Sequence, residues 1–597
     1  MSPKPEDNST MKRSDFIKYS LGASVGSLAI GKSQVAFGLK RNDTIRAAIS
    51  KANDRRVEEM LERYDRLVES SSRRGQSGFI LTLASAYCSP DSEYYRSLNL
   101  VEPMHNVAKA LILAQNSDGT FDFGNLQSPP DTAFMMEQLF RAQKILITDG
   151  SEQTINLRQS NRQIILDAAE ALTTGGIHTP NHRWAVSAAL SGINSLYPNQ
   201  KYVNRINDWL GEGIGQDADG EHPERSRNYD AAVNNPSLLD VAIYQKRPEL
   251  FDVISKNLEL TIHLTELNGE CETVASRRQD QEHGRYVMIH RYYLPFRYLA
   301  IRDNNPRFAA VANMIETKYM DTLGEHLADF LLHEELNMSL PKPAALEENY
   351  VKHFQNTHLV RIRRGNKTAS VFGGTDWHLG YGAWSGISHN PTFFKFRNGN
   401  AILESVRMSP AFFRTGYFRS NGLAVQGNEY RLEEQRQVPY HQPLPEKFRN
   451  KEGVYKMSPD GRFYSKMDFE NRPKDYKKLH SMVTVREVGN SGAFEMEFSV
   501  EETPRVPVTI ELCFRKGGQL SGVIPRENDT DGYFLSDGEG SYKVGNDVIT
   551  FGPGKMEHTR SPQSNEQYSV YNGDIEVEGY RVYITGITPF THKIRIG

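Results

Sequence analysis

The apolar residues of the first half of the chain recur with the period of an α-helix. Between residues 41 and 335 they stand three or four positions apart, as Val186, Ala189, Leu190 and Ile193 do. Short turn-rich segments separate these stretches, and no strand pattern lies between them. Because each helix must bury its apolar side on a neighbour, we expect a bundle, a solenoid or a closed toroid of helical hairpins. The sequence has no repeat of fixed length, which argues against a regular solenoid.

A different pattern follows the segment 336–348, where two prolines interrupt the helical period. From residue 349 to 597, apolar and polar residues alternate in short runs that are typical of antiparallel strands. The turns at 365–367 and at 398–399 each lie between two such runs and predict β-hairpins. The natural packing of about a dozen such strands is a large β-sandwich. We therefore predict an α+β multidomain protein: a helical domain at 41–335, a linker at 336–348 and an antiparallel β-sandwich at 349–597.

Residues 1–40 have the pattern of an export signal and its leader. Lys12 and Arg13 precede a run of small and apolar residues at 19–31, which is too short to span a bilayer. This arrangement resembles a twin-arginine export signal in which lysine replaces one arginine. We expect export to a bacterial periplasm or secretion; the alternative is an amphipathic helix of the mature fold. No other long uncharged run is present, so we expect no membrane segment in the mature protein.

Composition and charge exclude several classes of function. Hydrophobic residues make up 38% of the 597 residues and charged residues 24%, as in folded soluble proteins. The 71 Lys and Arg against 74 Asp and Glu give no global positive field, so we expect no nucleic-acid partner. Three distant cysteines provide neither a disulfide framework nor a close-spaced zinc site. A Gly-rich dinucleotide loop and a P-loop are both missing from the sequence, and we expect no cofactor and no metal.

Candidate chemistry gathers where predicted helices begin. Asn125 and Gln127 precede Pro129, Pro130 and Asp131, a combination that starts helices, and Asp131 is the expected N-cap. The start of a helix carries partial positive charge. Asn125 and Gln127 are therefore candidates to contact an anionic or polyhydroxyl ligand.

The strongest candidate is the run of Asn181, His182, Arg183 and Trp184, which leads directly into a predicted helix. The amide and the guanidinium bind carboxylates, the imidazole transfers protons, and the indole stacks on a pyranose ring. Such convergence of four functional side chains at one helix entrance fits a site for a carboxylated sugar.

Tyr229 is a second candidate for proton transfer. It follows His182 by 47 residues, a separation that fits one helical hairpin, so we expect the two to meet at one end of the helical domain. Beside Arg225 and Arg227, a phenol has its pKa lowered and can carry protons. The alternative is a core tyrosine with a satisfied hydroxyl.

Asn181 and His182 at a helix start, the segment 224–229 and the helical-then-β order resemble one superfamily of polysaccharide lyases. These enzymes combine an incomplete (α/α) toroid with an antiparallel β-sandwich, and they include heparinase II/III, chondroitin AC and hyaluronate, and alginate lyase types. The resemblance implies that Asn181 neutralises a uronate carboxylate. It also implies that His182 and Tyr229 are the base and the acid, and which of them is the base stays open.

Further residues of the same cleft follow from weaker signals. The resemblance implies a later arginine, for which Arg277 and Arg278 are the candidates and Arg278 is preferred. His283 and His290 stand seven apart and either line the cleft or form a polar seam between helices. His389 precedes the 398–399 hairpin, in a loop that either reaches the cleft or is a structural turn.

We therefore expect a lyase that cleaves a glycosidic bond at a uronic acid by β-elimination. This chemistry needs a neutralised carboxylate, a base near C5 and an acid near O4. The expected partner is a uronate-containing oligo- or polysaccharide. Within this class we include an exo-acting enzyme that cleaves glucuronate-containing glycans, for instance at a rhamnose–glucuronate or a glycosaminoglycan linkage. The sequence gives no oligomeric state.

Two other classes of function stay open. A glycoside hydrolase on a helical toroid would need paired carboxylates, which leaves the Asn-His-Arg run unexplained. Its candidate carboxylates are Asp131, Asp217, Asp219 and Glu221. A non-catalytic carbohydrate-binding protein would need exposed stacking plates. Its candidate plates are Trp184, Trp377 and Trp384.

Overall fold

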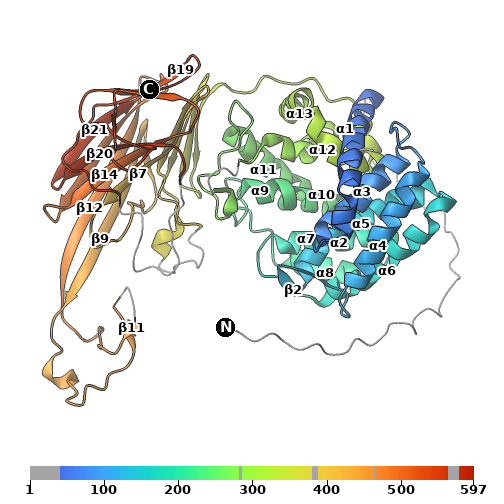
Figure 1. Ribbon diagram of the computed structural model, residues 1–597, viewed down its shortest axis with the longest axis horizontal. Helices are drawn as coiled ribbons and strands as arrows, with labels where there is room; N and C mark the ends of the chain where they lie inside the picture. The colour runs from blue at the N-terminus through green and yellow to red at the C-terminus, as the bar shows by residue number, and fades with distance from the viewer. Residues whose placement is uncertain (1–39, 282–285, 380–386, 461–463, 563–576) are drawn as a thin grey trace.

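The computed structural model describes residues 40–281, 286–379, 387–460, 464–562 and 577–597. A helical half comes first along the chain, and two large β-sheets follow beside it (Figure 1). This order confirms the predicted fold class. Residues 1–39 of the expected leader lie outside the described part of the chain. Within the described residues, none of the helices combines the length and the apolar character that crossing a membrane requires.

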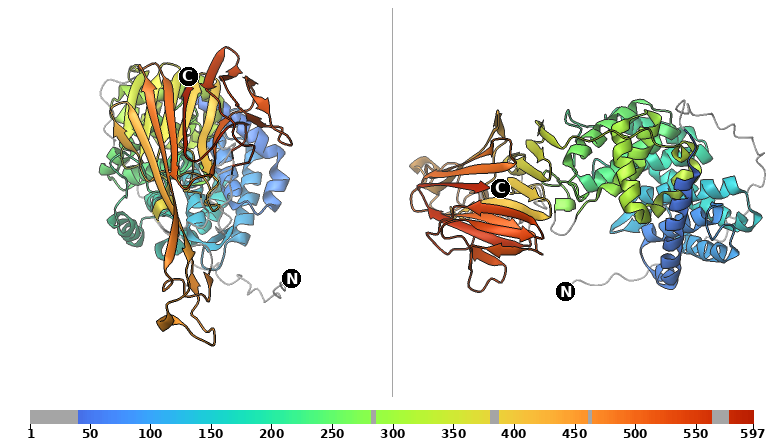
Figure 2. Two further views of the ribbon diagram at one scale, coloured as in Figure 1. Left: turned by 90° about the vertical axis from the view of Figure 1, so that its left-hand side faces the viewer. Right: turned by 90° about the horizontal axis from the view of Figure 1, so that it is seen from above.

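The helical half consists of helices that pack side against side around a toroid (Figure 2). In chain order they are α1 (Asp43–Glu62), α2 (Tyr64–Glu69), α3 (Arg73–Cys88), α4 (Val101–Ala114), α5 (Pro129–Asp149), α6 (Ile155–Thr174), α7 (His182–Leu196), α8 (Gln200–Gly211), α9 (Arg227–Tyr229), α10 (Asn235–Tyr244), α11 (Glu249–Leu264), α12 (Tyr293–Arg302), α13 (Pro306–Tyr319) and α14 (Leu327–Leu332). Helix α5 packs on α3 and on α7, and α7 packs on α10. These contacts place the start of α7 beside the helices that precede and follow it.

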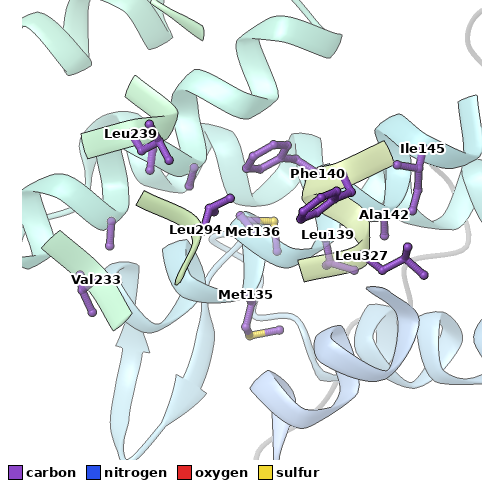
Figure 3. Packing of buried hydrophobic residues seen from close by; sticks show 14 of the residues in the cluster. Met135, Met136, Leu139, Phe140, Ala142, Ile145, Val233, Leu239, Leu294 and Leu327 are labelled. Carbon is purple, nitrogen blue, oxygen red and sulfur yellow. The ribbon is translucent and has the colours of Figure 1, made fainter. Parts of the chain in front are cut away.

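Helix α5 crosses the middle of the helical core. Its residues Met136, Leu139 and Phe140 are fully buried and lie near Leu327 of α14 (Figure 3). Gly192 of α7 lies directly against Phe140, because a Cβ at position 192 would come within 2.4 Å of the phenyl ring. The absence of a side chain therefore lets α5 and α7 approach closely.

A short hairpin interrupts the helical half. β1 (Phe121–Phe123) and β2 (Asn125–Ser128) pair antiparallel, so the prediction of a helical half without strands is wrong here. Strands of three and four residues are too short to produce a recognisable alternation. The Phe121 amide donates to Thr132 Oγ1 at 2.8 Å, which fixes the hairpin on α5.

The second half is a sandwich of two sheets. One sheet has the order β16-β17-β20-β14-β7-β6-β5-β4-β3 and the other β15-β18-β19-β21-β13-β12-β9-β8; all neighbours are antiparallel except β17 and β20. The strands are β3 (Asn349–Phe354), β4 (Leu359–Arg364), β5 (Lys367–Phe372), β6 (Phe394–Asn398), β7 (Ala401–Pro410), β8 (Ala424–Gln426), β9 (Glu429–His441), β12 (Lys474–Val488), β13 (Ala493–Glu502), β14 (Pro507–Phe514), β15 (Gln519–Ser521), β16 (Ile524–Pro525), β17 (Gly532–Phe534), β18 (Gly540–Val544), β19 (Asp547–Gly552), β20 (Tyr580–Ile587) and β21 (Phe590–Ile596). The hairpins β4–β5 and β6–β7 confirm the two predicted turns.

Buried ion pairs join the two halves. Three glutamates follow α11, and basic residues of the sandwich bind them. Arg361 Nη2 lies 2.8 Å from Glu266, and Arg397 Nη2 lies 2.8 Å from Glu270. Burial alone would raise the pKa of Glu270, but these guanidinium contacts, including a hydrogen bond from Arg515, lower it to about 2. The glutamates of this interface are therefore ionised at neutral pH.

Candidate active site

The start of α7 presents a buried amide nitrogen that has no acceptor among the described residues. Asn181 is the residue before the helix and is 1% exposed. Thr179 Oγ1 donates to Asn181 Oδ1 at 2.7 Å, which orients the amide. Among the described residues, Asn181 Nδ2 has no acceptor. A buried donor of this kind is suited to bind an oxygen of a ligand.

His182 is buried beside Asn181 as a neutral imidazole. Burial, and next the charge of His178, lower the pKa of His182 to about 4. The charges of Arg278 and Arg74 act in the same direction, and Asp131 opposes them. Its Nδ1 has no hydrogen-bond partner among the described residues. At neutral pH this side chain can therefore accept a proton, and it lies within the field of two arginines.

Tyr229 ends a single helical turn on the side of the toroid that faces the sandwich (Figure 1). Ser226 caps this turn, since its Oγ accepts from the Tyr229 amide at 3.2 Å. Arg278 Nη2 donates to the phenolic oxygen of Tyr229 at 2.8 Å, and its guanidinium carbon lies 4.4 Å from the ring centroid. A guanidinium in this position stabilises negative charge that develops on the phenolic oxygen.

The arginine beside Tyr229 is thus Arg278, and the expected influence of Arg225 and Arg227 is wrong. Arg225 donates to the main-chain oxygens of Gly374 and Asn356 in the sandwich. Arg227 is buried and is bound by Glu221 and Asp230. Both arginines therefore hold the backbone around Tyr229 and do not reach its hydroxyl.

Glu224 is a carboxylate that sequence reasoning left unplaced. Its Oε1 lies 3.1 Å from Arg278 Nη1, while Nη2 of the same guanidinium donates to Tyr229. Burial raises the pKa of Glu224 to about 7, although the charge of Arg278 opposes this rise. The protonation of Glu224 near neutral pH therefore controls the charge that holds Arg278.

Arg74 of α3 was also missed. It forms an ion pair with Asp131, and its guanidinium carbon lies 4.7 Å and 4.3 Å from the ring centroids of Phe123 and Phe134. Its Nε has no partner among the described residues, and its side chain is partly exposed. It stands more than a hundred residues before His182 in no motif, so only the fold could reveal it.

Asp131 itself has a different place from the one predicted. Ser128 is the N-cap of α5, because its Oγ accepts from the Asp131 amide at 3.3 Å, so the prediction of Asp131 as N-cap is wrong. Pro129 and Pro130 suit the first helical positions, and the cap therefore precedes them. Asn125 Nδ2 lies 3.5 Å from Asp131 Oδ2, while Gln127 is exposed at the end of the hairpin with φ of 45°. The structure thus places Asn125 beside Asp131, and the binding roles of Asn125 and Gln127 stay predictions.

Two members of the Asn-His-Arg-Trp run do not join the site. Arg183 binds Glu212 and the Gly213 carbonyl, and Trp184 is 1% exposed in the core. Consecutive residues on a helix point about 100° apart, so four of them cannot face one ligand. The roles predicted for Arg183 and Trp184 in substrate binding are therefore wrong.

Arg277 is engaged at the interface between the two halves. Its Nε and Nη2 bind the Asp376 carboxylate at 2.7 and 2.8 Å, and its Nη1 donates to the Pro223 carbonyl. All three of its guanidinium nitrogens are engaged by these protein partners, and its predicted role in substrate binding stays a prediction. His290 packs on Tyr319 at 5.1 Å, and no contact among the described residues joins it to Tyr229 or Arg278.

The loop that carries His389 lies against the segment that carries Arg278. Gln281 Nε2 donates to the Ile387 carbonyl at 2.8 Å, and the His389 ring lies edge-on to Trp377. His389 is 3% exposed, and its ring nitrogens have no partner among the described residues. Its predicted role stays a prediction. His283 and Trp384 lie outside the described residues.

A metal centre is not evident. In the described part of the chain no three His, Cys, Asp or Glu side chains stand close enough to hold a metal ion.

Solved structures of polysaccharide lyases have the same architecture. The Streptomyces coelicolor A3 chondroitin AC lyase, in complex with chondroitin sulphate, aligns with a TM-score of 0.56 at 10% identity over 92% of this chain and 79% of that one. Heparinase III gives 0.51 at 11% identity over 88% and 76%, and a Paenibacillus xanthan lyase gives 0.53 at 10% identity over 93% and 59%. No family model and no curated protein sequence matches the chain. The chain therefore shares the toroid-plus-sandwich fold of polysaccharide lyases across most of its length.

Proposed function

We propose that this protein is a polysaccharide lyase that cleaves the glycosidic bond at C4 of a uronic acid by β-elimination. The observation that carries the proposal is the hydrogen bond from Arg278 to the hydroxyl of Tyr229, in electrostatic reach of the neutral imidazole of His182. The fold shared with polysaccharide lyases supports the same class of reaction.

The reaction needs the negative charge of the substrate carboxylate to be neutralised. The proton at C5 is weakly acidic, and its removal leaves negative charge on the carboxylate oxygens. Asn181 Nδ2 is a buried donor without a partner, and Arg74 carries an unpartnered Nε nearby. We assign Asn181 and Arg74 to the binding of the substrate carboxylate, because Asn181 Nδ2 and Arg74 Nε each lack an acceptor within the described chain.

Proton transfer is assigned to His182 and Tyr229. His182 takes the proton from C5, the electrons of the C5–H bond form the C4–C5 double bond, and the C4–O4 bond breaks. Tyr229 gives its proton to the leaving O4, and Arg278 stabilises the phenolate that remains. A bound carboxylate raises the pKa of His182 from about 4, since a negative charge favours the imidazolium.

The two alternatives fit the structure less well. The carboxylates available to a hydrolase are held by other groups: Asp131 by Arg74, Glu221 by Arg227, and Asp219 by the amides of Asn356 and Thr357. Asp217 accepts from the amides of Asp219 and Glu221, so each of the four candidate carboxylates has a protein partner in the described structure. Burial of Trp184 removes one stacking plate of a binding protein.

The test is the product formed from uronate-containing polysaccharides. Purified protein is incubated with alginate, hyaluronan, chondroitin sulphate and polygalacturonate, and both ultraviolet absorbance and new reducing ends are measured. Elimination yields one unsaturated, absorbing uronate for each new reducing end. Reducing ends without absorbance would establish hydrolysis and overturn the proposal, and no cleavage of any uronate glycan would also contradict it.

A further inference from the structure

A two-stranded ribbon leaves the sandwich at one end of the eight-stranded sheet (Figures 1 and 2). β12 pairs with β9 as far as Lys474 opposite His441, but it pairs with β13 only from Leu479 onwards. The residue pairs 437–441 with 474–478 therefore have no further neighbour in the sheet. At roughly 3.4 Å per residue these five pairs extend the ribbon by about 17 Å.

Residues 437–478, called the arm below, have almost no core of their own. Beyond the ribbon the arm holds a short helical turn, η9 (Glu446–Phe448), and the two-residue strands β10 (Ser458–Pro459) and β11 (Tyr464–Ser465). Leu444 and Phe469 are its only buried residues among those described. Two arginines hold its backbone, since Arg449 and Arg472 donate to main-chain oxygens of the arm.

The arm exposes several large apolar and aromatic side chains. Tyr464 is 71% exposed and Tyr440 55%. Other large exposed side chains of the arm are Phe448, Val454, Met457, Met467 and Tyr476. Such a concentration on a projecting element is unusual for a surface that faces only water, and it marks a binding surface.

The arm is also basic, although the chain as a whole is slightly acidic. It contains ten Lys and Arg against six Asp and Glu, whereas the whole chain has 71 against 74. In the described structure none of its seven lysines forms an ion pair: Lys447, Lys451, Lys456, Lys466, Lys474, Lys477 and Lys478. Arg449 and Arg472 are used inside the arm, and the lysine charges are left for a partner.

We propose that the arm binds a uronate-containing polysaccharide chain, as a second binding element apart from the candidate active site. The proposal rests on the proposed function, because a polyanionic glycan is the partner that the active-site chemistry selects. Charge complementarity favours this partner, since ammonium groups attract carboxylates repeated along a sugar chain. The exposed tyrosine rings provide apolar faces for pyranose rings together with a polar hydroxyl.

The test measures binding without cleavage. The full chain with Tyr229→Phe is run in native gels that contain alginate, hyaluronan or polygalacturonate, with dextran as the neutral polymer. The arm variant carries Lys451→Gln, Lys456→Gln and Lys466→Gln, and a second variant carries Tyr464→Ala. The matched control removes three exposed lysines of the helical half by Lys51→Gln, Lys109→Gln and Lys318→Gln.

We expect retardation by at least one uronate polymer and none by dextran. The lysine variant is expected to bind about tenfold more weakly or worse, to show a weaker salt dependence than the parent, and to differ from the control variant. Equal binding by the arm variants and the parent would overturn the proposal, as would no retardation of the parent. If light scattering shows that the parent is a dimer and an arm variant is a monomer, the arm serves self-association and the proposal is overturned. Because binding is read without turnover, the proposed lyase activity succeeds or fails separately.

Discussion

Arg278 contacts two groups of the candidate site, Glu224 and Tyr229. One of its terminal nitrogens contacts Glu224 at 3.1 Å and the other the hydroxyl of Tyr229 at 2.8 Å. An ionised Glu224 holds the guanidinium in place, and a protonated one holds it less strongly. Glu224 is thus a positioning residue whose influence reaches the reaction through Arg278.

Glu224 is expected to give kcat/KM a pH dependence near neutrality. Its pKa is raised to about 7, so the carboxylate ionises and the activity rises as the pH increases through about 7. In Glu224→Gln this limb disappears, and the remaining activity is lower and flat between about pH 6 and 8. The measurement is a pH profile of kcat/KM for both proteins, and an unchanged limb in the variant would contradict this role.

The sequence predicted those residues of the candidate site that stand in a recognisable local motif, and it missed those that do not. Asn181, His182 and Tyr229 stand in short polar motifs at helix starts, and Arg278, which donates to Tyr229, also acts electrostatically on His182. Arg74 could not be found in this way, because it comes from α3, a helix distant in sequence that packs on α5, as α7 does. Contacts between helices far apart in sequence are a property of packing and leave no spacing to recognise.

At the scale of helices and strands, the predictions succeeded where the alternation of apolar and polar residues keeps one period over many residues. The long helices and the hairpins β4–β5 and β6–β7 have clear patterns, and the structure confirms them. The β1–β2 hairpin is too short for a period to show. The turn that carries Tyr229 continues into a π-helical segment, Asp230–Asn234, and such segments are frequent at functional sites but have no sequence signature.

The close approach of α5 and α7 predicts a cost for any side chain at position 192. Gly192→Ala would place a Cβ 2.4 Å from the ring of Phe140, and we expect destabilisation of about 1–3 kcal/mol from overpacking. Gly211→Ala is the matched control, since nothing lies within 4 Å of its added Cβ. Urea unfolding of the parent and both variants measures the free energy of unfolding. Equal values for Gly192→Ala and Gly211→Ala would show that α5 and α7 are less tightly packed than described.

At the scale of the whole molecule, the interface between the halves keeps the sandwich loops against the toroid. Glu270 binds Arg397 at 2.8 Å and Arg515 at 2.6 Å. The same interface includes the ion pair of Arg277 and Asp376. Arg277 directly precedes Arg278, whose guanidinium contacts Tyr229. The position of Arg278 therefore depends on both halves of the protein.

Breaking this interface is expected to destabilise the protein in a pH-dependent way. Glu270→Gln removes the charge that binds Arg397 and Arg515, although Arg397 keeps Glu266 and Arg515 keeps Glu404 as further partners; we expect a cost of about 3 kcal/mol at neutral pH. The folded-state pKa of Glu270 is about 2, below the roughly 4.3 of an unfolded chain, so its contribution is complete above about pH 4.3 and is lost as the pH falls toward 2. Denaturant unfolding of parent and variant at several pH values measures this difference. The exposed pair of Lys201 and Glu170 provides a control, Glu170→Gln, in which little change is expected. A constant difference down to pH 2 would contradict the assignment.

The most direct test of the central claim is the rate of unsaturated-product formation by Tyr229→Phe, on whichever uronate polymer the parent cleaves. This change removes only the hydroxyl that Arg278 contacts. We predict that the variant keeps the circular dichroism spectrum and polymer binding of the parent but loses at least about 100-fold in kcat. A variant that forms the absorbing product at the parental rate would show that the Tyr229–Arg278 pair does not carry the elimination.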